Sequence, residues 1–408
     1  MNITRYKDIE AFLFKQLPMF QRVGPKAFKK DLSNIEYLDA LLNYPHKSFK
    51  SIHIAGTNGK GSTSFFIASL LKQAGFKVGL YTSPHYKSYR ERVKVDGQMI
   101  PKNRVKLFVN ELISKGVFES DKKPSFFEIS VALAFCHFRD EQVDYAVIET
   151  GLGGRLDSTN IIRPMLSLIT NIGYDHMNFL GTTLAEIAQE KAGIIKEMTP
   201  VIIGRKQEET SAVFFQKAKE MKSQLSYASY NLISKEITKK FPSYQVENLN
   251  LAATAIRNLG ISLSEPNIEI ALSEGLANWG YMGRFQKLGS SPIIIADSAH
   301  NKMGIRNVFE QIKSIKYASL HIVLAVVADK DLNLVFPYFP KEAKYYFSAA
   351  KIPRAMEAQL LYEAASKEKL EGKIYKSVPR ALAAAKQSTS EDDLILVVGS
   401  IFTVAEVL

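Results

Sequence analysis

Residues 52–63 read Ile-His-Ile-Ala-Gly-Thr-Asn-Gly-Lys-Gly-Ser-Thr, and this stretch joins a predicted strand to a predicted helix. Its first residues form the short apolar run of a strand, and residues 62–74 have the apolar face of a helix. A glycine-rich turn between a strand and a helix lets backbone N–H groups and the helix N-terminus surround a phosphate chain. Lys60 supplies a mobile cation for the terminal phosphates. The strict phosphate-loop pattern fails, because Gly61 separates Lys60 from Ser62.

Strand-like and helix-like segments alternate on both sides of this stretch. Further strands are expected at residues 77–82, 144–149, 166–170 and 200–203, with helices at 126–139 and 184–195. Two helices, around residues 9–14 (ended by Pro18) and 32–42, come first, with a turn at 21–25 between them. A second block has strands at 293–296, 321–327, 344–347 and 394–398. This alternation predicts a mostly parallel sheet covered by helices on both faces.

The chain length and two turn-rich segments predict the domain organisation. A chain of 408 residues suggests two to three domains. Residues 278–284 and 289–292 are rich in glycine and other turn-forming residues, and they separate the two blocks. We therefore expect a domain boundary near residues 286–292 and place it after residue 287.

The composition is that of a globular protein with an excess of positive charge. Hydrophobic residues make up 46% and charged residues 23%, which excludes disordered and fibrous classes. The net charge of +12 favours an anionic partner without distinguishing nucleic acid, lipid, nucleotide or polycarboxylate. The single cysteine, Cys136, excludes an internal disulfide framework. The start of the chain lacks the apolar core of a signal peptide, and the longest apolar run, residues 320–328, is too short to span a bilayer. We expect a cytoplasmic protein.

Three further loops that follow predicted strands carry polar side chains. Residues 82–85 read Thr-Ser-Pro-His, residues 149–157 read Glu-Thr-Gly-Leu-Gly-Gly-Arg-Leu-Asp, and residues 170–176 read Thr-Asn-Ile-Gly-Tyr-Asp-His. Ligands of open α/β sheets bind beyond the carboxyl ends of the strands, so these loops are expected at one edge. Glu149 is a candidate ligand for Mg²⁺, which prefers oxygen, whereas His176 would be an unusual one.

Two other motifs have weaker signals by themselves. Lys191, within residues 189–193, lies on the polar face of a predicted helix, where an isolated lysine is ordinarily solvated. Residues 297–301 read Asp-Ser-Ala-His-Asn and follow the first strand of the second block. A second loop that faces the nucleotide would lie there if the site were between two domains.

Taken together, these motifs resemble the folylpolyglutamate synthase / dihydrofolate synthase family, within the Mur-type ATP-dependent amide-bond ligases. The resemblance runs from residues 21–24 to residues 399–404. The matching motifs lie at residues 53–63, 82–85, 90–92, 149–160, 175–176, 190–194, 283–285, 297–301 and 329–331. The unusual phosphate loop is this family's own variant.

The resemblance implies a fold of class α/β with two domains. A P-loop-type ATPase domain with a mostly parallel sheet would cover residues 1–287 and carry the folate or dihydropteroate pocket. A smaller, Rossmann-like C-terminal α/β domain, the glutamate-ligase domain, would cover residues 288–408.

The resemblance also implies a nucleotide site. The phosphates of ATP would lie on the loop formed by Gly56, Thr57, Asn58, Gly59, Lys60, Gly61, Ser62 and Thr63. Asn248 would lie on the adenine side, and Arg284, Asp297 and His300 would reach the nucleotide from the hinge and the second domain. Lys60, Lys191 and His300 would be the catalytic residues.

Metal and substrate residues follow from the same resemblance. Ser83, Glu149 and His176 would surround Mg²⁺. Lys191 matches a lysine that is carbamylated in the family, and its carbamate would bind a second Mg²⁺. Ser125, Phe127 and Asp157 match positions that line the pterin pocket, where Phe127 offers a stacking face.

The implied reaction joins L-glutamate to a reduced folate, extending a γ-linked chain, and also to dihydropteroate. ATP would convert the acceptor carboxylate into an acyl phosphate, which the glutamate amine then attacks. We expect a monomer that binds these small molecules and neither nucleic acid nor membrane.

One alternative is a Mur ligase that acts on a UDP-muramyl precursor, which the missing uridine-binding domain disfavours. The other is a nucleic-acid-binding ATPase, disfavoured because the lysines are scattered rather than gathered in a basic stripe.

Overall fold

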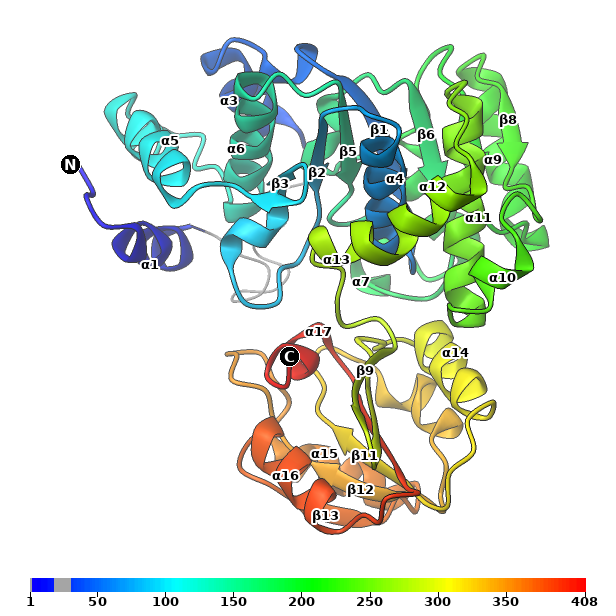
Figure 1. Cartoon of the computed structure of the whole chain (residues 1–408). Coiled ribbons are helices and arrows are strands. Elements are labelled where there is room, and N and C mark those ends of the chain that lie inside the picture. Colours follow the sequence, from blue (N-terminus) through cyan, green and yellow to red (C-terminus); the bar gives the residue numbers. More distant parts are fainter. Residues whose placement is uncertain (1, 18–30) are drawn as a thin grey trace. The chain divides into compact units, whose positions relative to one another are not determined.

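The computed structural model describes residues 2–17 and 31–408, and the chain divides into two compact units (Figure 1). The first unit is Met1–Tyr281 and the second is Met282–Leu408. Strand β9 (Gln286–Ser290) therefore belongs to the second unit, whereas the sequence placed the end of the first domain within it, after residue 287. The expected turn at residues 21–25 and the helix end at Pro18 lie outside the described residues.

The first unit contains an eight-stranded sheet in the order β4-β3-β2-β5-β1-β6-β7-β8. Its strands are β1 (Lys50–Ala55), β2 (Val78–Tyr81), β3 (Val93–Val95), β4 (Gln98–Met99), β5 (Tyr145–Glu149), β6 (Leu166–Ile169), β7 (Val201–Ile203) and β8 (Leu225–Tyr227). Neighbours pair in parallel except for β3 and β4, which run antiparallel at one edge. The predicted mostly parallel sheet is confirmed.

Helices cover both faces of this sheet because successive residues of each strand point to opposite sides. On β1, Ile54 packs into one hydrophobic core and Ala55 into another. The core of Ile54 includes side chains of α4 (Lys60–Gln73), α10 (Lys235–Thr238), α11 (Ser243–Asn258) and α13 (Leu276–Asn278). The opposite face carries α1 (Tyr6–Gln16), α3 (Ser33–Leu41), α5 (Lys102–Ser114), α6 (Phe126–Asp140), α7 (Met177–Leu180), α8 (Leu184–Ala192) and α9 (Glu208–Glu220). The expected helix over residues 184–195 ends earlier, at Ala192.

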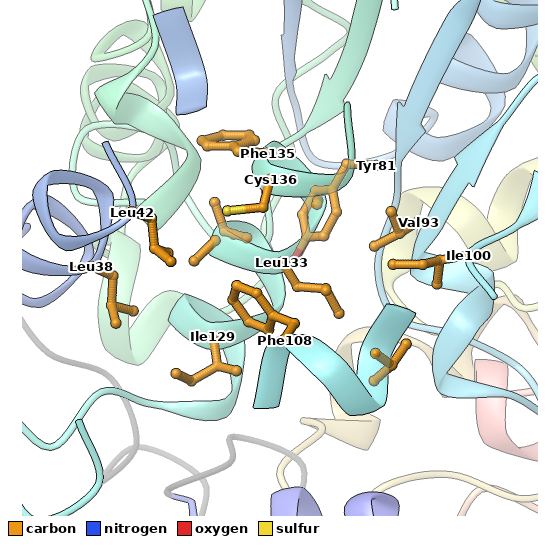
Figure 2. Close-up of a cluster of buried hydrophobic side chains, with 14 of the residues drawn as sticks. Leu38, Leu42, Tyr81, Val93, Ile100, Phe108, Ile129, Leu133, Phe135 and Cys136 are labelled. Atoms are coloured by element: carbon orange, nitrogen blue, oxygen red, sulfur yellow. The ribbon is translucent and has the colours of Figure 1, made fainter. Parts of the chain in front are cut away.

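The single cysteine lies in the core between α6 and its neighbours. Figure 2 shows the Cys136 thiol among aliphatic and aromatic side chains, with Leu42, Leu133 and Phe135 beside it. Burial raises the pKa of the Cys136 thiol to about 12. The reactive thiolate is therefore scarcely populated near neutral pH in the folded unit.

The second unit has a six-stranded sheet in the order β13-β12-β11-β14-β10-β9. Besides β9, its strands are β10 (Ile293–Ala296), β11 (Leu320–Leu324), β12 (Lys344–Phe347), β13 (Gly372–Ile374) and β14 (Leu394–Val398). Its longer helices are α14 (Lys302–Ile312), α15 (Ala358–Lys367) and α16 (Val378–Gln387), followed by α17 (Ile401–Ala405). Only β9 is antiparallel to its neighbour, so the predicted second α/β unit is confirmed.

Two details of this unit differ from the sequence analysis. Residues 286–290, expected near a boundary rich in turns, form β9, and the turn that joins β9 to β10 is confined to residues 291–292. The expected strand over residues 321–327 ends at Leu324. No helix in residues 2–17 and 31–408 has both the length and the apolar character needed to cross a membrane.

Candidate active site

The loops that carry the predicted site leave neighbouring parallel strands at their carboxyl ends. Strands β2, β5, β1 and β6 are adjacent and parallel, so the segments that follow them emerge at one edge of the sheet. These segments include Ser83 after β2, the loop that starts at Gly56 after β1, and His176 beyond β6, with Glu149 as the last residue of β5. The structure therefore brings these four predicted segments to the same edge.

The phosphate-type loop connects β1 to α4 through a backbone conformation that requires glycine. Gly59, the residue before α4, has φ of 86°. A Cβ at this position would overlap the side-chain amide of Asn248, which lies on α11. The loop is therefore tightly turned and closely covered on one side by Asn248, whose Nδ2 donates to the Tyr244 carbonyl (3.2 Å) and to Gln245 Oε1 (3.0 Å).

The segment after β6 clamps the loop from the other side. Asn171 Oδ1 accepts from the Asn58 N–H (3.1 Å), and Asn171 Nδ2 donates to the Asn58 carbonyl (3.1 Å). Thr170 Oγ1 donates to the same carbonyl (2.6 Å). The Thr57 hydroxyl accepts from the Gly173 N–H (3.0 Å). These contacts hold the loop backbone in one conformation.

Two lysines meet on one carbonyl oxygen of the loop. Lys60 Nζ donates to the Gly56 carbonyl (3.1 Å), and Lys191 Nζ, from α8, donates to the same oxygen (2.9 Å). Lys191 is only 3% exposed. Burial, reinforced by the charge of Lys60, lowers the pKa of Lys191 to about 7. A substantial fraction of the Lys191 amine is therefore neutral near physiological pH, contrary to the solvated lysine that its sequence context alone suggests.

A buried carboxylate lies beside the start of α4. Glu149 is 4% exposed, and its Oε2 accepts from the Ser83 N–H (3.0 Å). A Cβ on Gly61 would lie 3.6 Å from Glu149 Oε1, so the carboxylate borders the loop as well. The Thr63 hydroxyl is buried without a hydrogen-bond partner among the described residues. Carboxylate and hydroxyl oxygens are the donors that Mg²⁺ prefers, so these residues fit a Mg²⁺–nucleotide complex.

His176 lies at the start of α7 and is oriented by its neighbour. Its backbone N–H donates to Asp175 Oδ1 (3.0 Å), and its Nε2 lies 3.8 Å from the same oxygen. Within the described part of the chain, no group of three His, Cys, Asp or Glu side chains is arranged to hold a metal ion. The metal ligands predicted from the sequence include only two side chains of these types, His176 and Glu149. The other two predicted ligands are Ser83 and Lys191.

The glycine-rich loop after β5 is attached to the end of α8. Arg155 Nη2 pairs with Glu190 Oε1 (2.7 Å), and Asn160 Nδ2 donates to the Gly193 carbonyl (3.0 Å). Within this loop, Asp157 is 3% exposed and accepts from the Leu152 N–H (2.8 Å) and from the Thr159 N–H and hydroxyl. Asp157 thus shapes the loop that we assigned to the pterin pocket.

The two other predicted pocket residues lie at the start of α6. Ser125 caps this helix by accepting from the Glu128 N–H (3.2 Å), and Glu128 accepts in return from the Ser125 N–H (2.6 Å). The ring of Phe127 is half-buried, with its centroid 6.1 Å from that of Tyr81. A Cβ on Gly151 would lie 2.5 Å from Phe127 Cζ, so Phe127 contacts the loop that carries Asp157.

The predicted residues of the second unit gather where β10 ends. Asp297 Oδ2 accepts from the Phe285 N–H (2.6 Å), and Asp297 Oδ1 accepts from the Ala299 N–H (2.8 Å). Ser298 connects the other two, because its hydroxyl accepts from Arg284 Nη1 and its carbonyl accepts from His300 Nδ1 (3.0 Å). The structure therefore places Arg284, Asp297 and His300 in one cluster of this unit.

Sequence reasoning missed residues that support the loop rather than form it. Asn171 lay within a quoted motif, and its position just after a predicted strand was the signal that could have identified it. Tyr281 donates from its hydroxyl to Ser62 Oγ (3.2 Å), and nothing in the local sequence around Tyr281 indicated this contact.

Comparison with known proteins agrees with the two units. The family model described as the Mur ligase middle domain matches residues 54–264, and that of the Mur ligase glutamate ligase domain matches residues 283–401. The chain is 33% identical over 419 residues to the dihydrofolate synthase/folylpolyglutamate synthase of Escherichia coli (strain K12), covering 100% of this chain and 97% of that protein. It is 30% identical over 435 residues to the protein of the same name in Bacillus subtilis (strain 168), covering 99% and 98%.

One relative is longer than this chain, and its name includes a second activity. The chain is 32% identical over 430 residues to the Haloferax volcanii protein named "Probable bifunctional folylpolyglutamate synthase/dihydropteroate synthase". The alignment covers 98% of this chain but 50% of that protein, so the chain spans about half of its length.

Solved structures show the same architecture. E. coli FolC in complex with DHPP and ADP has a TM-score of 0.85 at 28% identity, covering 99% of this chain and 97% of that one. Mycobacterium tuberculosis folylpolyglutamate synthase, complexed with ADP and AMPPCP, has a TM-score of 0.85 at 26% identity, covering 98% and 97%. The sequence matches, the two family models and these folds agree with the motifs at the sheet edge: the chain belongs to the folylpolyglutamate synthase / dihydrofolate synthase family of the Mur ligase superfamily.

Proposed function

We propose that this protein is an ATP- and Mg²⁺-dependent ligase that adds L-glutamate to reduced folates and also to dihydropteroate. The observation that carries the proposal is the phosphate-type loop, held by Asn171 and Asn248, with Lys60 and Lys191 meeting on its Gly56 carbonyl. Relatives that share this chain's whole length carry both activities in their names. The paired reactions need the same ATP site and differ only in the acceptor.

The chemistry requires two displacements. The acceptor carboxylate takes the γ-phosphoryl group of ATP, which breaks the β–γ bond and yields ADP and an acyl phosphate. The glutamate nitrogen then bonds to the acyl carbon, loses a proton, and inorganic phosphate leaves. Lys60, at the loop, would neutralise charge on the transferred group. Positioning of the reactants supplies the rest, because no enzyme nucleophile takes part.

The residues that would hold the nucleotide and metal are those of the family motifs. In the first unit, residues 56–63 would bind the phosphates, Asn248 would lie on the adenine side, and Ser83, Glu149 and His176 would hold Mg²⁺. In the second unit, Arg284, Asp297 and His300 would contribute to the nucleotide site. Mg²⁺ bound there would neutralise phosphate charge during transfer.

A second Mg²⁺ would depend on modification of Lys191. Carbamylation requires a neutral amine, and the lowered pKa of Lys191, about 7, makes that form available. The carbamate would convert a buried cation into an oxygen ligand. We expect ¹³C-bicarbonate to give a carbamate NMR signal in the wild type that Lys191→Met lacks.

The pocket for the acceptor would be formed by Ser125, Phe127 and Asp157. Ser125 and Phe127 lie at the start of α6, and Phe127 contacts Gly151 in the loop that carries Asp157. We further propose two domains that divide after Tyr281, as the two compact units do, and a monomer that works in the cytoplasm. The fully buried, unreactive thiol of Cys136 is compatible with a reducing compartment.

The proposal is tested by parallel assays with purified protein, ATP, Mg²⁺ and radiolabelled glutamate. Tetrahydrofolate and dihydropteroate serve as acceptors, and a UDP-muramyl substrate represents the Mur ligase alternative. Lys60→Ala should lower incorporation at least about 100-fold with both folate-type acceptors, because it removes a cation from the transferred phosphate. Lys72→Ala is the matched control on the same helix, since Lys72 is about half exposed and pairs with Asp96.

Each result has a defined meaning. Incorporation with either folate-type acceptor, lost in Lys60→Ala and kept in Lys72→Ala, supports the proposal. No incorporation with either, or turnover with the UDP-muramyl substrate alone, overturns it.

A further inference from the structure

A segment at the end of the first unit runs along the helix that begins at the phosphate-type loop. This segment, residues 265–281, consists of α12 (Glu265–Ile270), one π-helical turn (Ala271–Gly275), α13 and the last residues of the unit; we call it the strap. Of this segment, the site described above includes only the last residue, Tyr281. π-helical turns are rare and often occur at functional positions.

The strap contacts a single face of α4 from end to end. Gln73 Nε2 donates to Asn267 Oδ1 (3.3 Å), and Ser69 Oγ donates to the Ala271 carbonyl (2.6 Å). Tyr281 then donates from its hydroxyl to Ser62 Oγ (3.2 Å). Residues 62, 69 and 73 are spaced by seven and four, which places them on one helical face. The strap therefore runs antiparallel to α4 and ends at the phosphate-type loop.

The middle of the strap lies unusually close to α4. A Cβ on Gly275 would overlap Ser69 Oγ, so only glycine permits this approach. This contact holds the strap at a fixed distance from α4. It lies about two turns of α4 away from Ser62.

The end of the strap is anchored by a buried lysine. Lys94 on β3 is 4% exposed, and its ammonium donates to the Trp279 carbonyl and lies 5.0 Å from the centroid of the Phe65 ring. The Tyr281 ring packs against Phe65 and Phe66, with centroids 5.6 Å from each. These contacts fix the Tyr281 side chain independently of its hydrogen bond to Ser62.

The direction of the hydrogen bond between Tyr281 and Ser62 determines whether Ser62 can still donate to a phosphate. Because Ser62 Oγ accepts from the Tyr281 hydroxyl, its own hydrogen remains available for another acceptor. Hydrogen bonds in series polarise one another, so the Ser62 hydroxyl becomes a better donor toward a phosphate oxygen. Ser62 is only 2% exposed, which increases the value of this contact by limiting competition from water.

We propose that Tyr281 is a positioning residue for the nucleotide: it orients and polarises Ser62 and ties phosphate binding to the strap. This inference rests on the proposed function of the loop. The strap leads directly out of the first unit, and Arg284, a predicted nucleotide residue, follows Tyr281 by three positions.

The test compares Mg²⁺–ADP binding by isothermal titration in wild type, Tyr281→Phe, Ser62→Ala and the double variant. Tyr281→Phe keeps the ring and removes the hydroxyl, so the fold should be retained. We expect its Kd to rise about threefold to tenfold, the range of one neutral hydrogen bond. The double variant should bind as Ser62→Ala does, because Tyr281 acts through Ser62. In the assay, the KM for ATP should rise while the KM for glutamate stays unchanged.

Ser69→Ala is the matched control, since it removes a hydrogen bond between α4 and the strap that is about two helical turns away from Ser62. It should lower the melting temperature without changing the Kd for Mg²⁺–ADP. An unchanged Kd in Tyr281→Phe, or effects of Tyr281→Phe and Ser62→Ala that simply add, would overturn the inference. If the wild type does not ligate glutamate, only the proposed function is refuted. The role of Tyr281 is still tested, because the titration measures Mg²⁺–ADP binding directly.

Discussion

At the residue scale, a chain of buried polar side chains runs from the central strand to the loop after β5. His53 on β1 is fully buried, and its Nε2 lies 2.8 Å from Thr159 Oγ1. Because that hydroxyl donates to Asp157 Oδ1 (2.5 Å), it must accept from His53, so Nε2 carries the ring proton. Burial, together with the charge of Lys196, lowers the pKa of His53 to about 3. A neutral histidine thus supports the loop assigned to the acceptor pocket.

This histidine predicts a specific loss of stability in acid. Below pH 6.5 the unfolded chain takes up a proton that folded His53 does not accept until about pH 3, so stability falls as the pH falls through this window. Urea unfolding of wild type and His53→Gln at pH 6.5, 5.5 and 4.5 measures this effect. The wild type should lose roughly 1 kcal/mol more per pH unit than the variant, which has no group to titrate there. A difference that stays constant with pH would show that His53 does not titrate in this way.

At the element scale, the turn from β1 into α4 combines two requirements that only glycine meets. Gly59 has a left-handed backbone (φ 86°), and its missing side chain leaves room for Asn248 on α11. The N-terminus of α4 can then present its N–H groups, while Asn171 holds the preceding carbonyl. The loop therefore depends on α11 and on the segment after β6 as much as on its own residues.

Comparing Gly59→Ala with a control glycine variant should distinguish a steric clash with Asn248 from the strain of a left-handed backbone. The added methyl group meets both the unfavourable φ and the Asn248 side chain, so the Kd for Mg²⁺–ADP should rise at least tenfold. Gly75→Ala at the other end of α4 is the control, because Gly75 has a similar φ of 93° but open space around it. That variant should lose about 1–2 kcal/mol of stability and bind Mg²⁺–ADP normally. Similar affinities for the two variants, measured by titration calorimetry, would remove the role assigned to Asn248.

At the scale of the whole molecule, each unit has its own sheet and its own core. The only tryptophan, Trp279, and the only cysteine, Cys136, both belong to the first unit. They lie in cores on opposite faces of the eight-stranded sheet. The two side chains therefore report independently on the two halves of one unit.

Unfolding of the first unit should be a single transition. Because both cores share the same central strands, Trp279 fluorescence and pulse labelling of Cys136 should give the same urea midpoint. Mg²⁺–ADP, which binds the folded form, should raise both midpoints equally. Labelling of Cys136 at a lower urea concentration than the fluorescence change would show that the two faces unfold separately.

Sequence patterns predicted the central elements well and the peripheral ones poorly. Strands β1, β5 and β6 are buried on both faces, so each reads as a short, mostly apolar run. Strand β9 reads Gln-Lys-Leu-Gly-Ser and lies at a sheet edge, where partly exposed side chains leave no apolar pattern. The antiparallel pair β3–β4 was missed for another reason: β3 has three residues, one of them the buried Lys94, and β4 has two exposed residues, so neither gives a recognisable pattern.

For the site, the local sequence was enough to identify the phosphate-type loop, because glycines and a lysine between a strand and a helix form a pattern that can be recognised without knowing the distant residues that hold the loop. The tertiary structure alone decided what surrounds that loop. It brought Lys191 onto the Gly56 carbonyl, Asn248 against Gly59, and Tyr281 onto Ser62 across 219 residues of chain. The physical reason is burial: these contacts change a pKa, restrict a backbone or orient a hydroxyl only when folding excludes water around them, and no local pattern in the sequence records which distant side chains do so.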